Sequence, residues 1–122
     1  MTNVQFSHHM YGDRQTIAIV VPSPKNLLAL LLDPQKPFLT QIGIAYCSSK
    51  DQYSRKKGRE LSTERLTEIT VGFNSMMMDK DNPNMLYFTL NNLSGNTPSQ
   101  FLFRINTKGS KTHYLGAYFG TV

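Results

Sequence analysis

The sequence has little of several residue types, and each shortage excludes a class of protein. A single cysteine, Cys47, stands among 122 residues, so neither an intrachain disulfide nor a paired-cysteine metal knuckle can form. The longest apolar run, Leu27 to Leu32, is far shorter than the roughly 20 residues that span a bilayer. The first ten residues are polar, unlike a secretory signal. We therefore expect a cytoplasmic chain that makes no contact with a membrane.

Acidic residues are also scarce, and their distribution is uneven. Lysine and arginine number 13 against 8 aspartates and glutamates, which gives a formal net charge of +5. The acids stop at Asp81, whereas Arg104, Lys108 and Lys111 follow it. A second positive region lies in the middle of the chain and contains Lys50, Arg55, Lys56, Lys57, Arg59 and Arg65. If the fold joins the two regions they form an anion site, and if it separates them they are solvated surfaces.

The length and the hydrophobic pattern predict one α+β domain over residues 1–122, with a mostly antiparallel sheet. A chain of this size buries about two thirds of its unfolded surface and folds without disulfides. Short β-branched or aromatic runs predict strands, and Asn/Asp/Pro-rich stretches predict the loop over 74–84. The predicted strands cover 16–21, 38–47, 70–73, 85–90, 100–107 and 112–122.

Two segments have a helical pattern. Residues 51–69 contain strong helix formers, and an apolar arc runs through Gly58, Leu61 and Ile69, which predicts the main helix. Ser23 followed by Pro24 is a typical helix start, and it precedes the leucine run that ends at Asp33. This run is either a short helix or a buried strand.

The start of the main helix is basic, which opposes the helix dipole. Cations there cost roughly 0.3–1 kcal/mol each when exposed, but they become favourable when an anion binds the free backbone N–H groups. Arg55 and Arg59 lie one turn apart on the same flank, where two guanidinium groups can hold adjacent phosphates. Lys56 points elsewhere and Lys57 points nearly opposite Arg55, so we expect the arginines to matter more. The alternative is an ordinary solvated helix start.

The aromatic residues of the last third of the chain allow two interpretations. Alternation along 101–104 places Phe101 and Phe103 on one strand face, with Leu102 and Arg104 on the other. The two phenylalanines are either core residues or a stacking platform for bases beside Arg104.

No catalytic or metal-binding arrangement stands out. The three histidines are His8, His9 and His113, and a metal site would need carboxylates that the sequence does not place near them. Cys47 has no evident general base. We therefore expect a protein that is not an enzyme and uses neither a metal nor a cofactor.

The segment SSKDQYSRKKGR, residues 48–59, resembles segments of the phage Thoeris anti-defence sponges. These are small α+β proteins that sequester cyclic nucleotide-type immune signals. The resemblance covers residues 48–66, and it implies a non-enzymatic, oligomeric phage protein that binds its ligand between subunits through aromatic and arginine side chains. It does not align ligand-contacting residues one by one, so Asn92 and Arg104 are chosen by residue type and region.

The sequence thus favours a binding protein for a small phosphate-rich ligand, most sharply a cyclic nucleotide or cyclic ADP-ribose type signal whose capture blocks host immunity. The candidate ligand-binding residues are Arg55, Lys56, Arg59, Asn92, Arg104 and Lys108. The alternative is a sequence-tolerant nucleic-acid-binding protein with a basic groove and stacking aromatics. A protein-interaction module and an enzyme follow in that order. Six methionines, seven phenylalanines and six tyrosines exceed the needs of one small core and predict a homo-oligomer.

Overall fold

The computed structural model describes residues 3–9, 14–47, 52, 54–95 and 97–120. It confirms the α+β class and the antiparallel sheet. Its elements are, in order, β1 (Val4–His9), β2 (Arg14–Val20), α1 (Pro24–Leu32), β3 (Phe38–Cys47), α2 (Arg55–Glu64), β4 (Thr67–Met78), β5 (Met85–Asn92), β6 (Gln100–Asn106) and β7 (Thr112–Tyr118).

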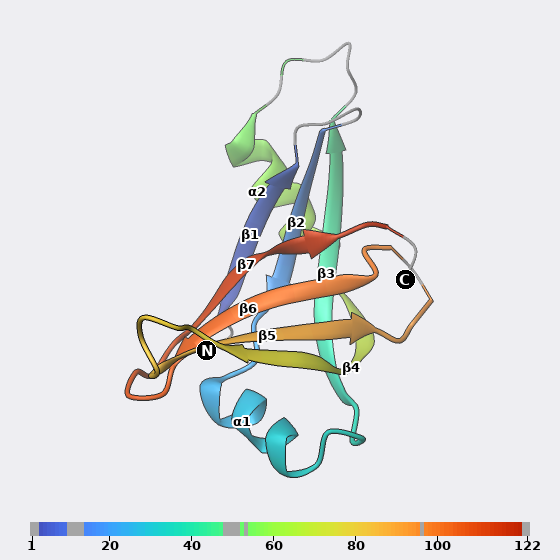
Figure 1. Cartoon of the computed structure of the whole chain (residues 1–122). Coiled ribbons are helices and arrows are strands. Elements are labelled where there is room, and N and C mark those ends of the chain that lie inside the picture. Colours follow the sequence, from blue (N-terminus) through green and yellow to red (C-terminus); the bar gives the residue numbers. More distant parts are fainter. Residues whose placement is uncertain (1–2, 10–13, 48–51, 53, 96, 121–122) are drawn as a thin grey trace.

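The seven strands form one sheet in which each strand pairs with its sequence neighbours, always antiparallel. The long strand β4 joins two halves, because its residues 67–71 pair with β3 and residues 71–78 pair with β5. A register shift between Phe73 and Ser75 marks a bulge, a feature that bends a strand and increases its twist. In Figure 1, β1–β3 accordingly run upright while β4–β7 lie across them.

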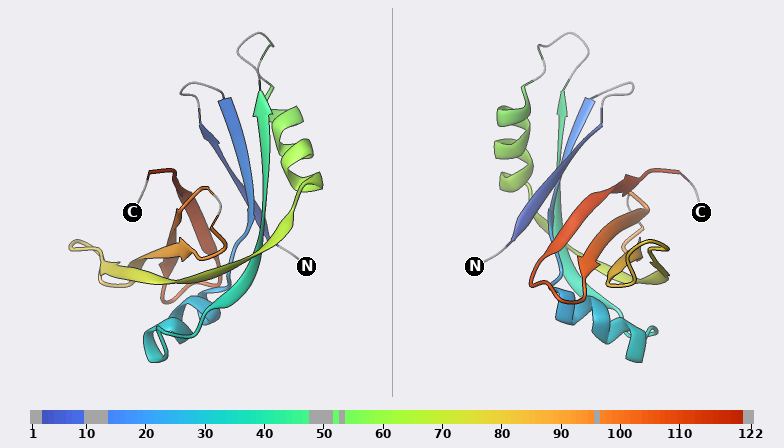
Figure 2. Two further views of the ribbon diagram at one scale, coloured as in Figure 1. Left: turned by 90° about the vertical axis from the view of Figure 1, so that its right-hand side faces the viewer. Right: turned by 60° about the vertical axis from the view of Figure 1, so that its left-hand side comes forward.

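The core lies on the inner side of this bent sheet, and α1 covers its lower end (Figures 1 and 2). The helical alternative for the leucine run is correct: Ser23 Oγ accepts a hydrogen bond of 3.1 Å from the Asn26 N–H, and Pro24 occupies the first turn. Leu27 and Leu30 of α1 then enter the core. The largest fully buried side chains include Phe88, Phe101, Phe103, Ile19, Leu90 and Ile105.

The second helix, α2, packs on the outer face of β2 and β3, away from β5–β7 (Figure 2). The two strands present small side chains on this face: Thr16, Ala18, Gly43 and Ala45. A Cβ atom at Gly43 would clash with the Ser62 carbonyl oxygen, and one at Gly58 would clash with the Thr16 hydroxyl group. The small residues therefore let the backbone of α2 approach the sheet closely, and Ser62 is completely buried.

The edge strands β1 and β7 meet through side chains. The Gln5 amide donates from Nε2 to the Thr112 carbonyl oxygen and accepts at Oε1 from the Tyr114 N–H, both at 2.7 Å. Ser7 Oγ and Tyr114 Oη share a hydrogen bond of 2.8 Å. The rings of His9 and Phe119 meet edge to face with their centroids 5.0 Å apart. This seam brings the sheet close to a closed barrel.

The predicted main helix was too long at both ends. Helix α2 begins at Arg55 and ends at Glu64, with Arg65 as its C-cap, so residues 67–69 belong to β4 instead. The physical reason is the β-branched alternation of Thr67, Ile69 and Val71, which supplies the partner strand that β3 requires. Positions 51 and 53 lie outside the described residues. The two helices are thus nearly equal, with 9 and 10 residues.

The sequence pattern does not predict β1, and it predicts β4 too short. Residues 4–9 form β1 although the N-terminal segment reads as polar, because its odd-numbered side chains face the seam with β7. Residues 74–78, predicted as loop, continue β4, where Met76 pairs with Phe88 and packs against the core. Only the Asn/Asp/Pro-rich stretch after Met78 is the turn.

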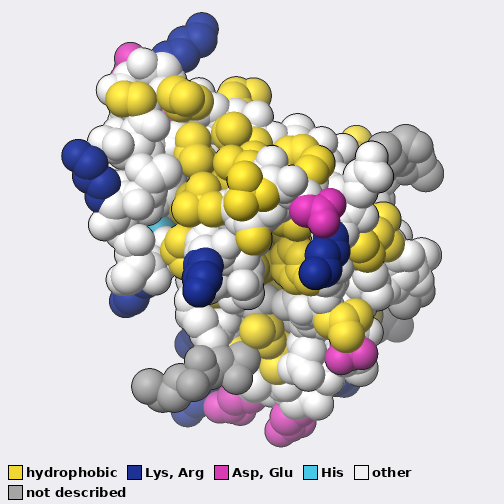
Figure 3. Space-filling view, turned by 90° about the horizontal axis from the view of Figure 1, so that it is seen from below, with side chains coloured by type: hydrophobic (Ala, Val, Ile, Leu, Met, Phe, Trp, Pro, Cys, Tyr) yellow, Lys and Arg dark blue, Asp and Glu magenta, His cyan; other side chains and the backbone are white. Residues whose placement is uncertain are grey.

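Several apolar side chains remain on the outside. Figure 3 shows hydrophobic groups gathered on the underside, where α1 lies, and Leu32 of this helix is 91% exposed. Leu31 and Leu39 are exposed as well. These side chains are surface that an oligomer would cover, and the homo-oligomer stays a prediction. Within the described parts of the chain, neither helix has the length and apolarity needed to cross a bilayer.

Candidate functional site

The first turn of α2 is basic, as the sequence predicts. Ser54 is the N-cap, and its Oγ accepts a hydrogen bond of 3.2 Å from the Lys57 N–H. No acidic residue occupies this turn, whereas Arg55, Lys56 and Lys57 do, and all three are exposed. The N–H groups of the first helical residues point out of the helix end and lack intrahelical acceptors by geometry. The turn therefore combines the positive end of the helix dipole with three cations.

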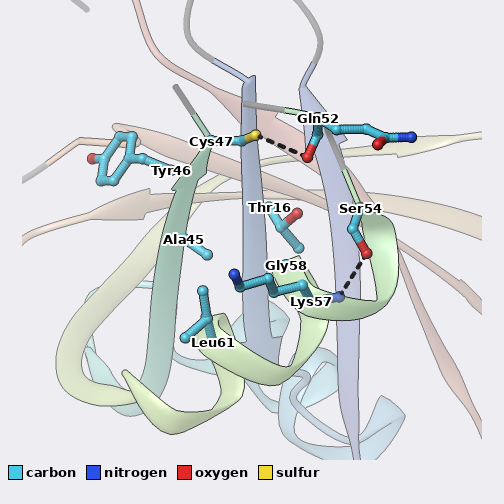
Figure 4. Close-up of a pocket in the computed structure, with 9 residues that line it drawn as sticks. All are labelled: Thr16, Ala45, Tyr46, Cys47, Gln52, Ser54, Lys57, Gly58 and Leu61. Atoms are coloured by element: carbon cyan, nitrogen blue, oxygen red, sulfur yellow. Dashed lines mark hydrogen bonds between the residues drawn. The ribbon is translucent and has the colours of Figure 1, made fainter. Parts of the chain in front are cut away.

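A pocket of about 310 Å³ opens between this turn and the outer face of β2 and β3 (Figure 4). Its described lining consists of Thr16, Ala45, Tyr46, Cys47, Gln52, Ser54, Lys57, Gly58 and Leu61. Figure 4 shows the Lys57 side chain reaching from α2 towards Ala45 on β3. The small side chains at positions 16, 45 and 58 leave this space open, while Leu61 forms an apolar wall. The pocket thus offers one ammonium group, hydroxyl groups and an apolar surface side by side.

The two arginines lie on the other flank of α2, next to β1. Burial lowers the pKa of His8 from its ordinary value of 6.5, and the positive charges of Arg55 and Arg59 lower it further, as does His9. His8 Nδ1 lies 3.1 Å from Thr16 Oγ1, so the imidazole sits over the strand on which α2 packs. This flank is therefore a second cationic surface, and Thr16 separates it from the pocket.

The fold does not bring the predicted site residues together. Arg104 lies in β6 and Lys108 in the β6–β7 turn, whereas the elements that α2 packs against are β1, β2 and β3 (Figure 1). The two positive regions of one chain are therefore separate. Asn92 is used within its own loop, where Nδ2 donates to the Pro98 carbonyl oxygen at 2.9 Å and Oδ1 accepts from the Ser94 N–H at 3.0 Å.

The sequence pattern centres the site on Arg55 and Arg59 and predicts that Lys57, on the opposite side of the helix, matters less. In the structure, Lys57 lines the pocket. The expected angle between Arg55 and Lys57 on the helix points Lys57 towards β3 and the pocket, and the site on Arg55 and Arg59 stays a prediction. Small residues in the sequence could have indicated this side of the helix. Gly58 on the helix and Ala45 on the strand allow the two elements to lie close together, and both residues line the pocket.

The aromatic alternatives are also decided. Phe101 and Phe103 are each 1% exposed, which makes them core residues and excludes them as a stacking platform. Among the residues that the structure describes, no group of three histidine, cysteine or carboxylate side chains is arranged to hold a metal ion. Comparison of the chain with protein-family models, with curated proteins and with solved structures finds no match.

Proposed function

We propose that the protein binds a small phosphate-bearing ligand in the pocket beside the start of α2. The observation that carries the proposal is the placement of this pocket at a helix N-terminus whose first turn holds cations and no acid. Helix N-termini are favourable sites for phosphate groups, and Lys57 adds a positive charge inside the pocket. A volume of about 310 Å³ is at the lower end of the range for small-molecule sites.

The lining favours a nucleotide-type ligand over inorganic phosphate alone. Ser54 and Lys57 stand at the helix start and would take the phosphate, while Ala45 and Leu61 form a surface on which a ring can lie. Cys47 is the one strong nucleophile in the described lining, which contains neither a histidine nor a carboxylate to act as its base. This composition supports retention of the ligand rather than its turnover.

Sequestration is the form of this function that the resemblance of residues 48–59 to the anti-defence sponges favours. A phage protein that holds a nucleotide-derived signal in such a pocket removes it from the host defence that depends on it. Sponges of that kind bind their ligand between subunits, and the separation of Arg104 from α2 within one chain is compatible with a site that a second copy completes.

The test is calorimetric titration of the full chain with ADP, pyrophosphate and a cyclic dinucleotide at 50 and 200 mM salt. We expect Lys57→Gln to weaken binding by about tenfold or more, since a hydrogen bond to a charged group contributes roughly 1.5–3 kcal/mol. Lys36→Gln is the matched control, because this exposed lysine precedes the start of β3 whereas the pocket lies at the end of that strand, and its loss changes the net charge equally.

The double variant Arg55→Gln/Arg59→Gln separates the two flanks of α2. If this variant loses more affinity than Lys57→Gln, the ligand binds the surface beside His8 rather than the pocket. Equal losses in all variants that vanish at 200 mM salt would reduce the region to a diffuse positive surface and refute the pocket. Native mass spectrometry of protein purified from a host reports the retained ligand and the number of subunits.

A further inference from the structure

A second surface with ligand-binding character lies on the outer face of β5–β7, which we call the bare face. Its side chains alternate with the core residues of the same strands and include Tyr87, Thr89, Leu102, Arg104, His113 and Tyr118. Neither helix covers it, since α2 packs on β1–β3 and α1 lies under the core (Figure 2). Tyr118 is 57% exposed and Leu102 is 38% exposed.

Arg104 lies in the middle of the bare face, and one of its donor atoms lacks a hydrogen-bond acceptor in the part of the chain that the structure describes. It pairs directly with Tyr87 on β5 and with His113 on β7, so an aromatic side chain occupies the neighbouring position on each side of it in the sheet. Its Nε is buried and has no hydrogen-bond partner among the described residues. A buried donor without an acceptor is costly, and a phosphate or base oxygen from a ligand would satisfy it.

The charge of this part of the chain fits a polyanion. Between Met85 and Tyr118 the sequence contains no acid, and its charged residues are Arg104, Lys108 and Lys111. Lys108 lies in the turn after β6 and is exposed, so the positive charges run from the middle of the bare face to one end of it. The nearest acid along the sheet, Asp79, follows β4 and accepts a hydrogen bond of 3.3 Å from the Tyr87 hydroxyl group.

Beside Arg104 the bare face has a mainly apolar hollow of about 300 Å³. It is lined by Thr89, Gln100, Phe101, Leu102, Gly116, Ala117 and Tyr118. Gly116 lies at the register shift between β6 and β7 with φ of +155°, and it has no side chain to fill the space. The exposed Tyr118 ring borders the hollow, so a flat ring that enters it can stack on an aromatic surface.

We propose that the bare face binds single-stranded nucleic acid, with one base in the hollow beside Tyr118 and the backbone phosphates along Arg104 and the Lys108 turn. An open sheet face that carries tyrosines and an arginine, with no acid on its own strands β5–β7, is the combination by which proteins hold single strands without reading their sequence. A duplex keeps its bases stacked and paired, so it offers no free base to the hollow.

The experiment measures binding of a fluorescein-labelled dT12 strand to the full-length protein by anisotropy at 50–200 mM salt. We expect Arg104→Gln to weaken binding by about tenfold and to reduce the slope of log K against log salt by about 0.7, the value for one phosphate contact to a single strand. Tyr118→Ser should weaken binding with little change in that slope, because it removes stacking and no charge. Lys36→Gln, an equal loss of charge away from the bare face, should change affinity by less than about twofold.

The outcomes that would overturn the proposal are distinct from those that test the pocket at α2. Unchanged binding of dT12 by both Arg104→Gln and Tyr118→Ser would refute it, as would equally tight binding of the corresponding duplex. Loss of dT12 binding in Arg55→Gln/Arg59→Gln alone would assign the strand to α2. Sedimentation of a dimer that Tyr118→Ser converts to monomer, with no dT12 binding, would show that a second copy occupies this face instead. Thermal unfolding confirms that each variant is folded.

Discussion

The outer faces of the two halves of the sheet differ in their side chains and in whether a helix covers them. On β2 and β3 the outward side chains are small, and a helix lies directly on the backbone; on β5–β7 they are tyrosine, leucine, arginine and histidine, and no described helix covers them. The outer face of a strand can therefore either pack against a helix or remain open to solvent, depending on the size of its side chains. The difference teaches that the pocket at α2 forms between two layers, which the small residues of the first half admit, whereas the hollow of the second half lies open on the sheet itself.

The largest expected effect tests whether the two faces of β6 differ as the register indicates. Phe103→Ala should destabilise the protein by about 3–5 kcal/mol, since it removes a fully buried ring from the core. Leu102→Ala, one residue earlier on the bare face, should cost less than about 1 kcal/mol. Urea unfolding followed by circular dichroism measures both. Similar losses for the two variants would mean that the bare face is covered.

A smaller effect tests the close contact of α2 with β3. Gly43→Val should destabilise the protein by about 2–3 kcal/mol, because the new side chain meets the Ser62 carbonyl and the backbone at Arg65, which cannot turn aside. Gly109→Ala is the control: a Cβ there meets only atoms of Asn106 at 3.4 Å, and the expected change is within about 0.5 kcal/mol. If Gly43→Val keeps its stability and its affinity for ADP, the helix does not fix the pocket.

The smallest expected effect concerns His8 and the charge beside it. Its pKa is lowered in the folded protein by burial first and by Arg55 and Arg59 next, so the folded state binds fewer protons than the unfolded state. The stability that depends on a neutral His8 is therefore fully present above pH 6.5, the ordinary pKa, and is lost as the pH falls through the lowered value, because the unfolded state then binds the extra proton.

NMR titration of the His8 imidazole measures this effect directly. We expect Arg55→Gln to raise the pKa of His8 towards 6.5, whereas Lys36→Gln should leave it unchanged. An anion bound on the β1 flank would raise it as well, so the same titration in the presence of ADP distinguishes that flank from the pocket. A pKa that Arg55→Gln does not move would place the guanidinium group away from β1.

The sequence predicts most elements of the fold, and its failures have physical causes. Local signals included the right answer where propensity and packing agree: they gave a helix after Ser23–Pro24 and a core role for Phe101 and Phe103, each as one of two alternatives that the structure then decided. They failed at β1, whose polar residues are recruited by contacts with β7 about one hundred positions away. They also failed after Glu64, where pairing with β3 overrides helix propensity.

The candidate site was predictable only in part. The basic first turn and its cap are local features, and residues 54–57 display them in the sequence itself. Which side of the helix faces a pocket depends on the strands beneath it, so Lys57 could not be chosen over Arg55 from helical angles alone. The separation of Arg104 and Lys108 from α2 follows from the bend at β4, which carries β5–β7 away from the face where α2 lies.

The Gln5 seam has a consequence for behaviour at high concentration. The carboxamide presents the same donor and acceptor as a peptide group, and it occupies the Thr112 carbonyl and the Tyr114 N–H that an incoming strand would otherwise use. Exposed strand edges are templates for intermolecular pairing and aggregation. One glutamine therefore occupies two polar groups at the edge of β7, and the bare face can stay open while these groups are unavailable to an added strand.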